Sequence, residues 1–567
     1  MQTESASTPA ASTPTGAGTI WPRLRLAALA LLVLGAAGLA VAGRQPWYDE
    51  FYSFYVVRPG VPVGDLAAAW LRDNHPPTFY ALAWLWARLI VPSGLGGVEA
   101  LRTLNLALLA VGAGALAWRA RGDAWLRGLI WPYCLALAAT LAMVDRIDQL
   151  RSYFLSFVLV ALVAPMLAGV ARGQRSGWAL GIALMLALSV HVVTTLIVLG
   201  LTGGIVALLL ARRRWREAAR LSGIAGLGSV PFAVFMAVQL RTIVDNTQSF
   251  WIPGGPSAAR WAIEQEWVDA TLGNPALAIA ALIGFARLAS RRSDTPERRA
   301  KKWEPVFCKN DAAANAYGIA RDSQITHDAI GVIGAMLGGL ALALAVLIAV
   351  HLHRPIIIAR YLVALDPVLA LIVAMGASEA LRRIPAHDNL AWARIAIDLI
   401  LLTGAAWALR TNLAITLARP GWDGTARVIA ARVAACPQTR VMPALRWNAM
   451  TLGMMPVDNR AVVPFAYRLV AARWHITLTG PDAPCIDRPG ACPRLFWAEH
   501  VAGQHPTADA IIRGLNTDGL GVGAGRVERI GDGWVFAEDQ PASRAISRQP
   551  MSRRQNPSAK SSASTAR

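Results

Sequence analysis

The sequence predicts an all-α polytopic membrane protein with a small α/β domain outside the membrane at its C-terminal end. The chain has 567 residues, of which 55% are hydrophobic and only 16% charged, and its mean hydropathy is +0.41. Soluble domains usually carry about 25% charged residues, and several apolar runs here reach the roughly 20 residues that cross a bilayer. After residue 413 the sequence turns polar, with short segments typical of strands.

The net charge fits this membrane assignment. The formal charge is +20, which in a soluble chain would suggest a nucleic-acid partner. Here much of the positive charge falls in short segments between apolar runs, where it marks the cytoplasmic side of a membrane. We therefore expect a membrane, and no nucleic acid, as the partner. The five cysteines have no tight metal-ligand spacing.

The first apolar run predicts an uncleaved span. Residues 1–20 are rich in Ser, Thr, Pro, Ala and Gly and predict a disordered tail. The apolar run over 21–42 starts with Arg23 and Arg25, which place that start in the cytoplasm. A cleaved signal peptide is the alternative, because the small residues at 40–42 resemble a cleavage site. The apolar core exceeds the roughly 7–15 residues of signal peptides, which favours a span.

Ten further spans are expected. The remaining apolar runs cover residues 101–118, 126–144, 152–171, 177–211, 220–240, 272–289, 329–350, 361–381 and 394–413. As one helix, the run over 177–211 would be about 50 Å long, too long for a hydrocarbon core of roughly 30 Å. We therefore expect it to fold back near His191, which gives about eleven spans and a transmembrane domain over 21–413.

Residues 44–100 predict a long outer loop whose helices lie along the membrane. Residues 65–73 predict a short helix with Leu66 and Trp70 on one face, which suits a helix in the interface plane. Residues 78–91 are apolar but number only about 14, which favours an interfacial or re-entrant segment over a span.

The positions of the basic residues test this topology. They cluster at Arg119, Arg121 and Arg127; at Arg172 and Arg175; at Arg212, Arg213, Arg214, Arg216 and Arg220; over 287–302; and at Arg382, Arg383 and Arg394. If residues 78–91 do not cross, all these clusters face the cytoplasm, as the positive-inside rule requires. If they did cross, every cluster would face outward. We therefore expect a cytoplasmic N-terminus and a cytoplasmic loop over 291–328.

Many polar residues gather on the opposite, outer face. They are Asp49, Glu50, His75, Asp145, Arg146, Asp148, Gln149, Arg151, His191, Arg241, Asp245, His351, His353, Arg354 and Arg360. Polar groups at span ends on one side of a membrane predict an outward-facing polar cavity. The alternative for each residue is a place in a solvated loop.

Residues 414–540 predict an extracytoplasmic α/β domain. We expect a helix over 425–434 and strands over 439–443, 494–499 and 533–537. An exported location permits a disulfide between Cys485 and Cys492, or between either of them and Cys436. Residues 541–567 predict a flexible tail.

Several short motifs follow one another in a fixed order. They are Asp49-Glu50, within the aromatic stretch 47–52; His75-Pro76-Pro77-x-x-Tyr80; Glu99-x-x-Arg102; Gln149-x-Arg151-x-Tyr153; His191; and Arg360-Tyr361-Leu362. This ordered set resembles the GT-C membrane glycosyltransferases, in particular the glycosyltransferase family 39-like group of protein O-mannosyltransferases and lipid A aminoarabinose transferases. The resemblance covers about residues 20–415 and implies a GT-C-like helical bundle.

The resemblance also implies an activity. A sugar would pass from a polyprenyl-phosphate-linked donor to a protein, lipid or glycan acceptor on the outer face of the bacterial inner membrane. Asp49 falls at the position of the catalytic acid/base, with Glu50 beside it. The substrate-binding candidates are His75, Arg102, Asp148, Gln149, Arg151, Tyr153, His191, Arg360 and Tyr361. The family often has Glu at the position of Gln149, so either Asp148 or Asp145 supplies any carboxylate needed there for a metal or an acceptor, or that role is absent. The sequence leaves open whether a divalent metal takes part.

The residue types suit this chemistry. A carboxylate near the acceptor takes the proton released during attack, and arginines neutralise the phosphate leaving group through bidentate contacts. Arg151 and Arg360 have the alternative of lying at the interface from helix ends. His75 alternatively shapes its loop, and His191 alternatively closes a tight turn. A transporter or flippase that binds substrate with the same outer charges is the rival function, and a non-catalytic scaffold is a third.

Overall fold

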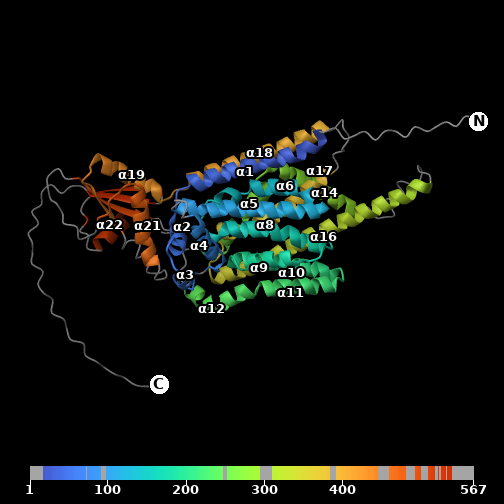
Figure 1. Cartoon of the computed structure of the whole chain (residues 1–567), viewed down its shortest axis with the longest axis horizontal. Coiled ribbons are helices and arrows are strands. Elements are labelled where there is room, and N and C mark those ends of the chain that lie inside the picture. Colours follow the sequence, from blue (N-terminus) through green and yellow to red (C-terminus); the bar gives the residue numbers. More distant parts are fainter. Residues whose placement is uncertain are drawn as a thin grey trace, which may run out of the picture.

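The computed structural model describes residues 17–71, 73, 75–90, 97–246, 252–293, 309–382, 391–444, 459–479, 492–499, 508–517, 522, 525–531 and 533–538. Helices run side by side through most of its length, and a small sheet lies at one end (Figure 1). Of the predicted tails over 1–20 and 541–567, residues 1–16 and 541–567 lie outside the described residues, as do Cys308 and Cys485. Residues 17–20 begin a helix, so the expected disorder is wrong there.

Helices occupy every predicted apolar run. They are α1 (Ala17–Gly43), α5 (Val98–Gly122), α6 (Ala124–Ala139), α7 (Ala142–Asp145), α8 (Ser152–Ala171), α9 (Trp178–Leu188), α10 (Val192–Ala211), α11 (Trp215–Gly228), α12 (Val230–Asn246), α14 (Pro275–Ser293), α16 (Lys309–His353), α17 (Leu365–Leu381) and α18 (Ala391–Ala418). Among the described residues, six helices are long and apolar enough to cross a membrane alone, or eight spans if two bent pairs each count as one. A multi-pass membrane protein is thus confirmed, and the count of eleven stays a prediction.

The run over 177–211 folds back where the sequence predicts it. Helix α9 ends at Leu188, and α10 begins at Val192 directly after His191. The Thr195 hydroxyl donates to the carbonyl oxygens of Leu188 and His191, at 2.8 and 3.0 Å. This side chain satisfies backbone groups that the break between the helices exposes.

The predicted outer loop over 44–100 forms three short helices, α2 (Tyr48–Val57), α3 (Val63–Trp70) and α4 (Thr78–Ile90). They lie together near one end of the bundle (Figure 1). With 13 residues, α4 is about 20 Å long, short of the hydrocarbon core. Its buried face carries Phe79, Tyr80, Ala83 and Ala87, so the predicted short helices of this loop are present.

Two segments differ from the sequence analysis. Helix α13 (Pro256–Leu272), where no helix was expected, meets α14 at 86°. Trp261 and Trp267 on α13 are exposed, which suits a helix at the membrane interface. Helix α16 begins at Lys309, so 309–328 is helical, although it still precedes the candidate span that begins at Ala329. Three of these residues, 312–314, are alanines, the strongest helix formers. The cytoplasmic position of the 291–328 connection stays a prediction.

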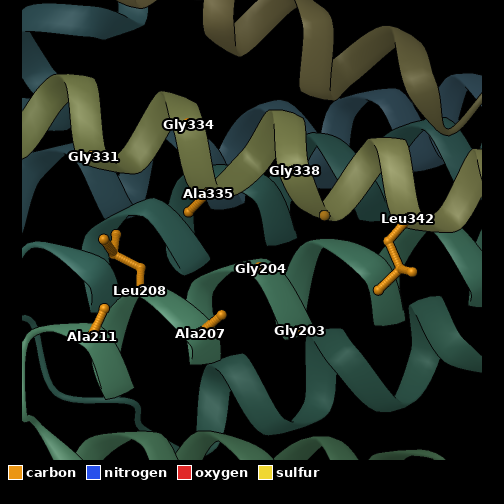
Figure 2. Close-up of a pocket in the computed structure, with 11 residues that line it drawn as sticks. Gly203, Gly204, Ala207, Leu208, Ala211, Gly331, Gly334, Ala335, Gly338 and Leu342 are labelled. Atoms are coloured by element: carbon orange, nitrogen blue, oxygen red, sulfur yellow. The ribbon is translucent and has the colours of Figure 1, made fainter.

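Small residues bring pairs of helices close together. A Cβ at Gly204 of α10 would overlap the backbone oxygen of Ala335 of α16, and a Cβ at Gly284 of α14 would overlap that of Gly376 of α17. Such close approach is typical of membrane helices, whose association depends on packing. A hollow of about 420 Å³ between α10 and α16 is lined only by Gly, Ala and Leu, so it offers no reactive group (Figure 2).

The C-terminal part folds as predicted into an α/β unit. Its elements are α19 (Trp422–Ala435), β1 (Arg440–Pro443), α21 (Asn459–Arg473), β2 (Arg494–Glu499), α22 (Ala508–Thr517), β3 (Gly525–Ile530) and β4 (Gly533–Glu538). The sheet has the order β1-β2-β4-β3, with β1 parallel to β2 and the other pairs antiparallel. The 425–434 helix and all three predicted strands are confirmed, whereas α21, α22 and β3 were missed. Of the cysteine pairings left open, the structure forms Cys436–Cys492.

This C-terminal unit packs directly on α2. Phe51 of α2 contacts Trp422 with ring centroids 5.0 Å apart, and Phe465 of α21 lies 5.8 Å from Phe54 and 5.2 Å from Tyr55. The helix that carries the acidic pair is therefore held between the helical bundle and the strand-containing unit.

Candidate functional site

Asp49 and Glu50 both lie in the first turn of α2, where the helix dipole favours acidic side chains. Successive residues of a helix point about 100° apart, so the two carboxylates enter different surroundings. The Asp49 side chain is 17% exposed and pairs with Arg360 at 3.3 Å, whereas Glu50 is fully buried and pairs with Arg102.

Aromatic rings surround the partner of Asp49. Arg360 lies in the short 3-10 helix η2 (Ala359–Tyr361), which precedes α17. Its guanidinium carbon lies 4.7 Å from the ring centroid of Trp47, 5.7 Å from that of Tyr361 and 6.0 Å from that of Tyr153. These distances allow cation–π attraction, which holds the Arg360 guanidinium beside the partly exposed Asp49 carboxylate.

Two histidines extend this group of rings. The ring centroid of His191 lies 4.9 Å from that of Tyr361, 5.9 Å from that of Tyr153 and 5.7 Å from that of His75. Burial, together with the positive charges of His75, Arg151 and Arg360, lowers the pKa of His191 well below its usual value. His191 is therefore neutral at physiological pH and offers a hydrogen-bonding ring without charge.

Arg151 approaches from the start of α8. Its Nη1 donates to the Tyr80 hydroxyl at 3.2 Å and to the Ser53 hydroxyl at 3.3 Å. Asp73 lies 3.2 Å from Nδ1 of His75. Burial alone would raise the pKa of Asp73, but His75 and Arg151 bring it below its usual value. We call Trp47, Asp49, His75, Tyr80, Arg151, Tyr153, His191, Arg360 and Tyr361 the aromatic–arginine cluster.

Glu50 begins a second, buried group of ion pairs. Arg102 donates from Nε and Nη2 to both oxygens of Glu50, at 2.7 and 2.6 Å, and the Leu150 backbone N–H donates to one of them at 2.9 Å. Arg102 also donates to the carbonyl oxygens of Val41 and Arg44, at 3.3 and 2.8 Å. The Arg102 guanidinium thereby joins the end of α1 to the start of α2, and the Glu50 carboxylate joins both to the turn before α8.

The same group continues through Asp145 and Asp148. Arg44 lies 3.1 Å from Asp148 and 3.3 Å from Asp145, and Arg419 lies 2.5 Å from Asp145. Arg146 pairs with Asp145 as well. Burial raises the pKa of Asp148 to about 7, although Arg44 and Arg102 oppose this shift.

Amide side chains hold the turn in place. The Gln149 amide donates to the carbonyl oxygen of Asp145 at 2.6 Å. Asn105 donates to the carbonyl oxygens of Ile147 and Gln149, at 2.9 and 2.7 Å. This turn therefore delivers Arg151 and Tyr153 from a fixed backbone. We call Arg44, Glu50, Arg102, Asp145, Arg146, Asp148, Gln149 and Arg419 the buried ion-pair network.

Comparison with known proteins bears on the whole arrangement. No protein-family model and no curated protein sequence matches the chain. The crystal structure of ArnT from Cupriavidus metallidurans in the apo state aligns over 92% of this chain and 98% of its own, with a TM-score of 0.50 and 13% sequence identity. The chain has the ArnT fold. ArnT, an aminoarabinose transferase, is a GT-C family glycosyltransferase, so the predicted fold is confirmed.

A second ArnT structure gives a similar result. ArnT from the same organism bound to undecaprenyl phosphate aligns over the same shares of the two chains, with a TM-score of 0.48 and 14% identity. At such identities the likeness to ArnT is one of fold. The chemistry has to follow from the side chains of this chain.

On this ArnT fold, the predicted site residues fall into two groups that meet at α2. Asp49, His75, Arg151, Tyr153, His191, Arg360 and Tyr361 lie in the aromatic–arginine cluster, and Glu50, Arg102, Asp148 and Gln149 lie in the buried ion-pair network.

Some predicted outer residues have other roles. His351 accepts the backbone N–H groups of Ile356 and Ile357 on its Nδ1, at 3.1 and 3.0 Å, and closes a turn. Arg354 donates to the carbonyl oxygen of Val244 at 3.3 Å on the surface.

The sequence analysis missed several members of the two groups. Arg44 and Arg419 join the buried ion-pair network, and an arginine at the outer end of a span is a signal that also marked Arg151 and Arg360. Tyr80 was named in a motif but not as a site residue. Glu266 lies outside both groups but pairs with Arg146 at 3.5 Å, and it gave no signal beyond being an acidic residue near a predicted span.

Proposed function

We propose that this chain is a membrane glycosyltransferase that moves a sugar from a polyprenyl-phosphate-linked donor to an acceptor on the extracytoplasmic face. The observation that carries the proposal is the partly exposed Asp49–Arg360 pair, 3.3 Å apart and ringed by Trp47, Tyr153 and Tyr361. It combines a base for an acceptor with a cation for a phosphate. The ArnT fold supports it, because ArnT is a transferase of this general kind.

Asp49 is the proposed general base. An acceptor hydroxyl or amine must lose a proton as it attacks the anomeric carbon, and a carboxylate within hydrogen-bonding reach accepts that proton. The transition state has cationic character at the sugar ring, which a nearby carboxylate stabilises. Glu50 is fully committed to Arg102 and the Leu150 N–H, so its proposed role is to fix the start of α2.

Arg360 and Arg151 are the proposed phosphate partners. The leaving group is a phosphate, which needs neutralisation of its charge more than protonation. When the donor phosphate takes Arg360, the Asp49 carboxylate loses its ion-pair partner and is free to accept a proton from the acceptor. His75, Tyr153, His191 and Tyr361 would line the sugar, while Arg102, Asp148 and Gln149 keep the turn before α8 in place.

The same proposal sets the surroundings of the protein. It places the chain in a bacterial plasma membrane with the N-terminus in the cytoplasm. Residues 21–413 form the catalytic membrane domain, and residues 414–540 form an extracytoplasmic domain that packs on α2. The acceptor is a lipid, a protein or a glycan that reaches the outer leaflet.

The test is transfer of label in proteoliposomes. The full chain is supplied with radiolabelled undecaprenyl-phosphate sugars, one sugar at a time, and with envelope lipids and proteins as acceptors. One sugar should give a covalent product, and Asp49→Asn should lower the rate by about 100-fold or more, because it removes a general base. Arg360→Gln should mainly raise the donor KM.

Asp65→Asn is the matched control, because Asp65 is an exposed acid in the first turn of α3, in the same outer loop. It should leave the rate unchanged. Undiminished transfer by a correctly inserted Asp49→Asn variant would rule out the assigned base. Uptake of a lipid-linked sugar into vesicles without any covalent product would instead establish the rival function, a flippase.

A further inference from the structure

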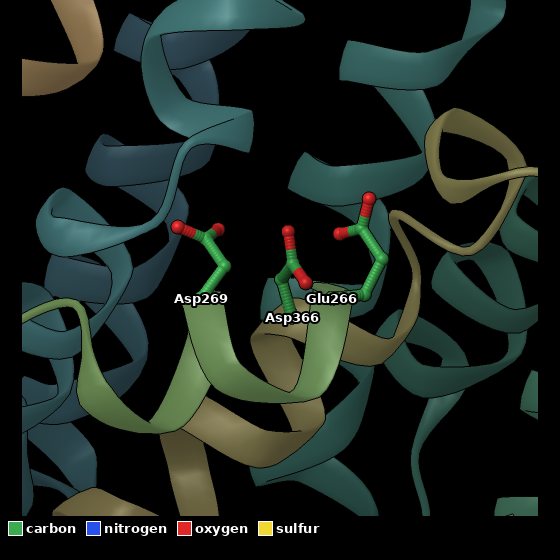
Figure 3. Close-up of side chains that lie close together, drawn as sticks. All are labelled: Glu266, Asp269 and Asp366. Carbon is green, nitrogen blue, oxygen red and sulfur yellow. The ribbon is translucent and has the colours of Figure 1, made fainter. Parts of the chain in front are cut away.

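Three carboxylates meet outside both groups of the proposed site. Glu266 and Asp269 lie one turn apart on α13, and Asp366 lies in the first turn of α17. One carboxylate oxygen from each lies within 4.8 Å of the other two. All three side chains converge on the same space (Figure 3). We call Glu266, Asp269 and Asp366 the carboxylate triad.

Asp366 is the member that demands an explanation. Its side chain is fully buried, and neither of its carboxylate oxygens has a hydrogen-bond partner among the described residues. It stands between Glu266 and Asp269, with its carboxylate directed into the triad (Figure 3). A buried carboxylate without a donor costs several kcal/mol in general, so such a group either takes up a proton or faces a positive charge, from a side chain or from a bound metal ion.

The described part of the chain supplies little of that positive charge. In the part of the chain that the structure describes, Arg146 forms an ion pair with the triad, at 3.5 Å from Glu266, and it shares its charge with Asp145. The Leu141 backbone N–H donates to Asp269 at 2.6 Å. Three acidic groups thus face one shared guanidinium and one amide.

We propose that the carboxylate triad binds a hard divalent cation of the Mg²⁺, Mn²⁺ or Ca²⁺ class. Such cations take carboxylate oxygens as ligands at about 2.0–2.6 Å, so two ligands on opposite sides of one ion lie about 4–5 Å apart. The separation within the triad fits this spacing. All the side-chain ligands are oxygens, which favours these cations over the softer metals that seek sulfur or imidazole.

The proposed cation joins elements that border the candidate site. It ties α13, which meets α14 at 86°, to the start of α17. Asp366 follows η2, the turn that carries Arg360 and Tyr361, by five residues along the chain. The cation would therefore hold η2 in place without touching the sugar donor, and its binding is independent of the transfer reaction proposed above.

The test measures binding of Mn²⁺ to the full chain in detergent after treatment with a chelator. Free Mn²⁺ is followed by electron paramagnetic resonance, and competition with Mg²⁺ and Ca²⁺ ranks the three ions. Wild type should bind one Mn²⁺ per chain and show a higher Tm when Mn²⁺ is present. Asp366→Asn and Glu266→Gln should each weaken binding by at least 10-fold and reduce the rise in Tm.

Glu264→Gln is the matched control, because Glu264 lies on the exposed face of the same helix and pairs with Arg260 at 2.7 Å. It should bind Mn²⁺ like wild type. Absence of bound Mn²⁺ in wild type at millimolar concentration would overturn the proposal, as would unchanged affinity in folded Asp366→Asn and Asp269→Asn variants. Neither readout involves sugar transfer, so failure here leaves the proposed activity untouched, and the reverse also holds.

Discussion

At the residue scale, the neighbouring carboxylates of Asp49 and Glu50 differ in exposure and in hydrogen bonding because their surroundings differ. Asp49 keeps some contact with solvent and has one ion-pair partner at 3.3 Å. Glu50 has three hydrogen bonds to its oxygens and no exposed surface. The first arrangement leaves a carboxylate free to exchange partners, and the second fixes the backbone around it.

This difference predicts opposite costs for removing the two charges. Glu50→Gln leaves the Arg102 guanidinium buried without its counter-charge, and breaking such a pair costs about 3–5 kcal/mol. We therefore expect Glu50→Gln to lower stability by about 3 kcal/mol in urea unfolding of the detergent-solubilised protein. Asp49→Asn should change stability by less than about 1 kcal/mol, because its pair is partly exposed.

Glu217→Gln provides the comparison, because Glu217 pairs with Arg214 at 3.5 Å on the surface. Its cost should stay below about 1 kcal/mol. The double variant Glu50→Gln with Arg102→Gln should recover part of the loss, because it removes both buried charges. If Glu50→Gln cost no more than Glu217→Gln, Glu50 would not anchor the start of α2.

At the element scale, α2 depends on contacts with the C-terminal unit. Arg473, the last residue of α21, pairs with Glu99 of α5 at 2.6 Å and with Asp423 of α19 at 2.8 Å. Together with the packing of Phe465 on α2, these ion pairs close the C-terminal unit against the bundle. The element that carries Asp49 is thus positioned from both sides.

Arg473→Gln should loosen this junction without unfolding the protein. The guanidinium is one-third exposed, so the cost in global stability should stay below about 1 kcal/mol. Local opening becomes more frequent when a few contacts hold two units together. We expect backbone amides of α2 to exchange hydrogen about three- to five-fold faster, measured by mass spectrometry.

Arg432→Gln serves as the control, because Arg432 pairs with Glu528 within the C-terminal unit. It should leave exchange in α2 unchanged. Equal exchange in the Arg473→Gln and Arg432→Gln variants would show that the ion pairs of Arg473 do not hold the junction.

At the scale of the whole molecule, apolar length and charge position predicted most of the helices. The backbone polar groups of a span must form hydrogen bonds within the span, so an apolar composition predicts a helix. The length of the run over 177–211 predicts the break near His191. Composition and length do not predict which charged residues form ion pairs with one another. Arg44 pairs with Asp145 and Asp148, about a hundred residues away, and Arg419 joins them from the other end of the chain.

Other features were hidden for related physical reasons. In the sequence, Glu266 and Asp269 resemble ordinary polar residues of a loop. Their place in the fold depends on the 86° bend between α13 and α14, which only the tertiary structure reveals. The choice of Cys492 over Cys485 as the partner of Cys436 depends on β1 and β2 lying side by side. Local sequence holds little information about either.

The predicted membrane orientation is testable with two glycines. Gly64 near the start of α3 and Gly122 at the end of α5 are both exposed, and a Cβ at either would meet no atom within 4 Å. Single Gly64→Cys and Gly122→Cys variants are made in a background with Cys134, Cys308 and Cys485 replaced by Ser, which keeps the Cys436–Cys492 disulfide. Each variant is then treated with a membrane-impermeant maleimide, before or after lysis of spheroplasts.

Gly64→Cys should react in intact spheroplasts, because the predicted topology places the loop over 44–100 outside the cytoplasm. Gly122→Cys should react only after lysis, because it lies beside Arg119, Arg121 and Arg127, which the positive-inside rule places in the cytoplasm. The reverse pattern would turn the aromatic–arginine cluster toward the cytoplasm and remove the basis for an extracytoplasmic acceptor. Reaction of both before lysis would place the two glycines on one side and contradict the crossing by α5.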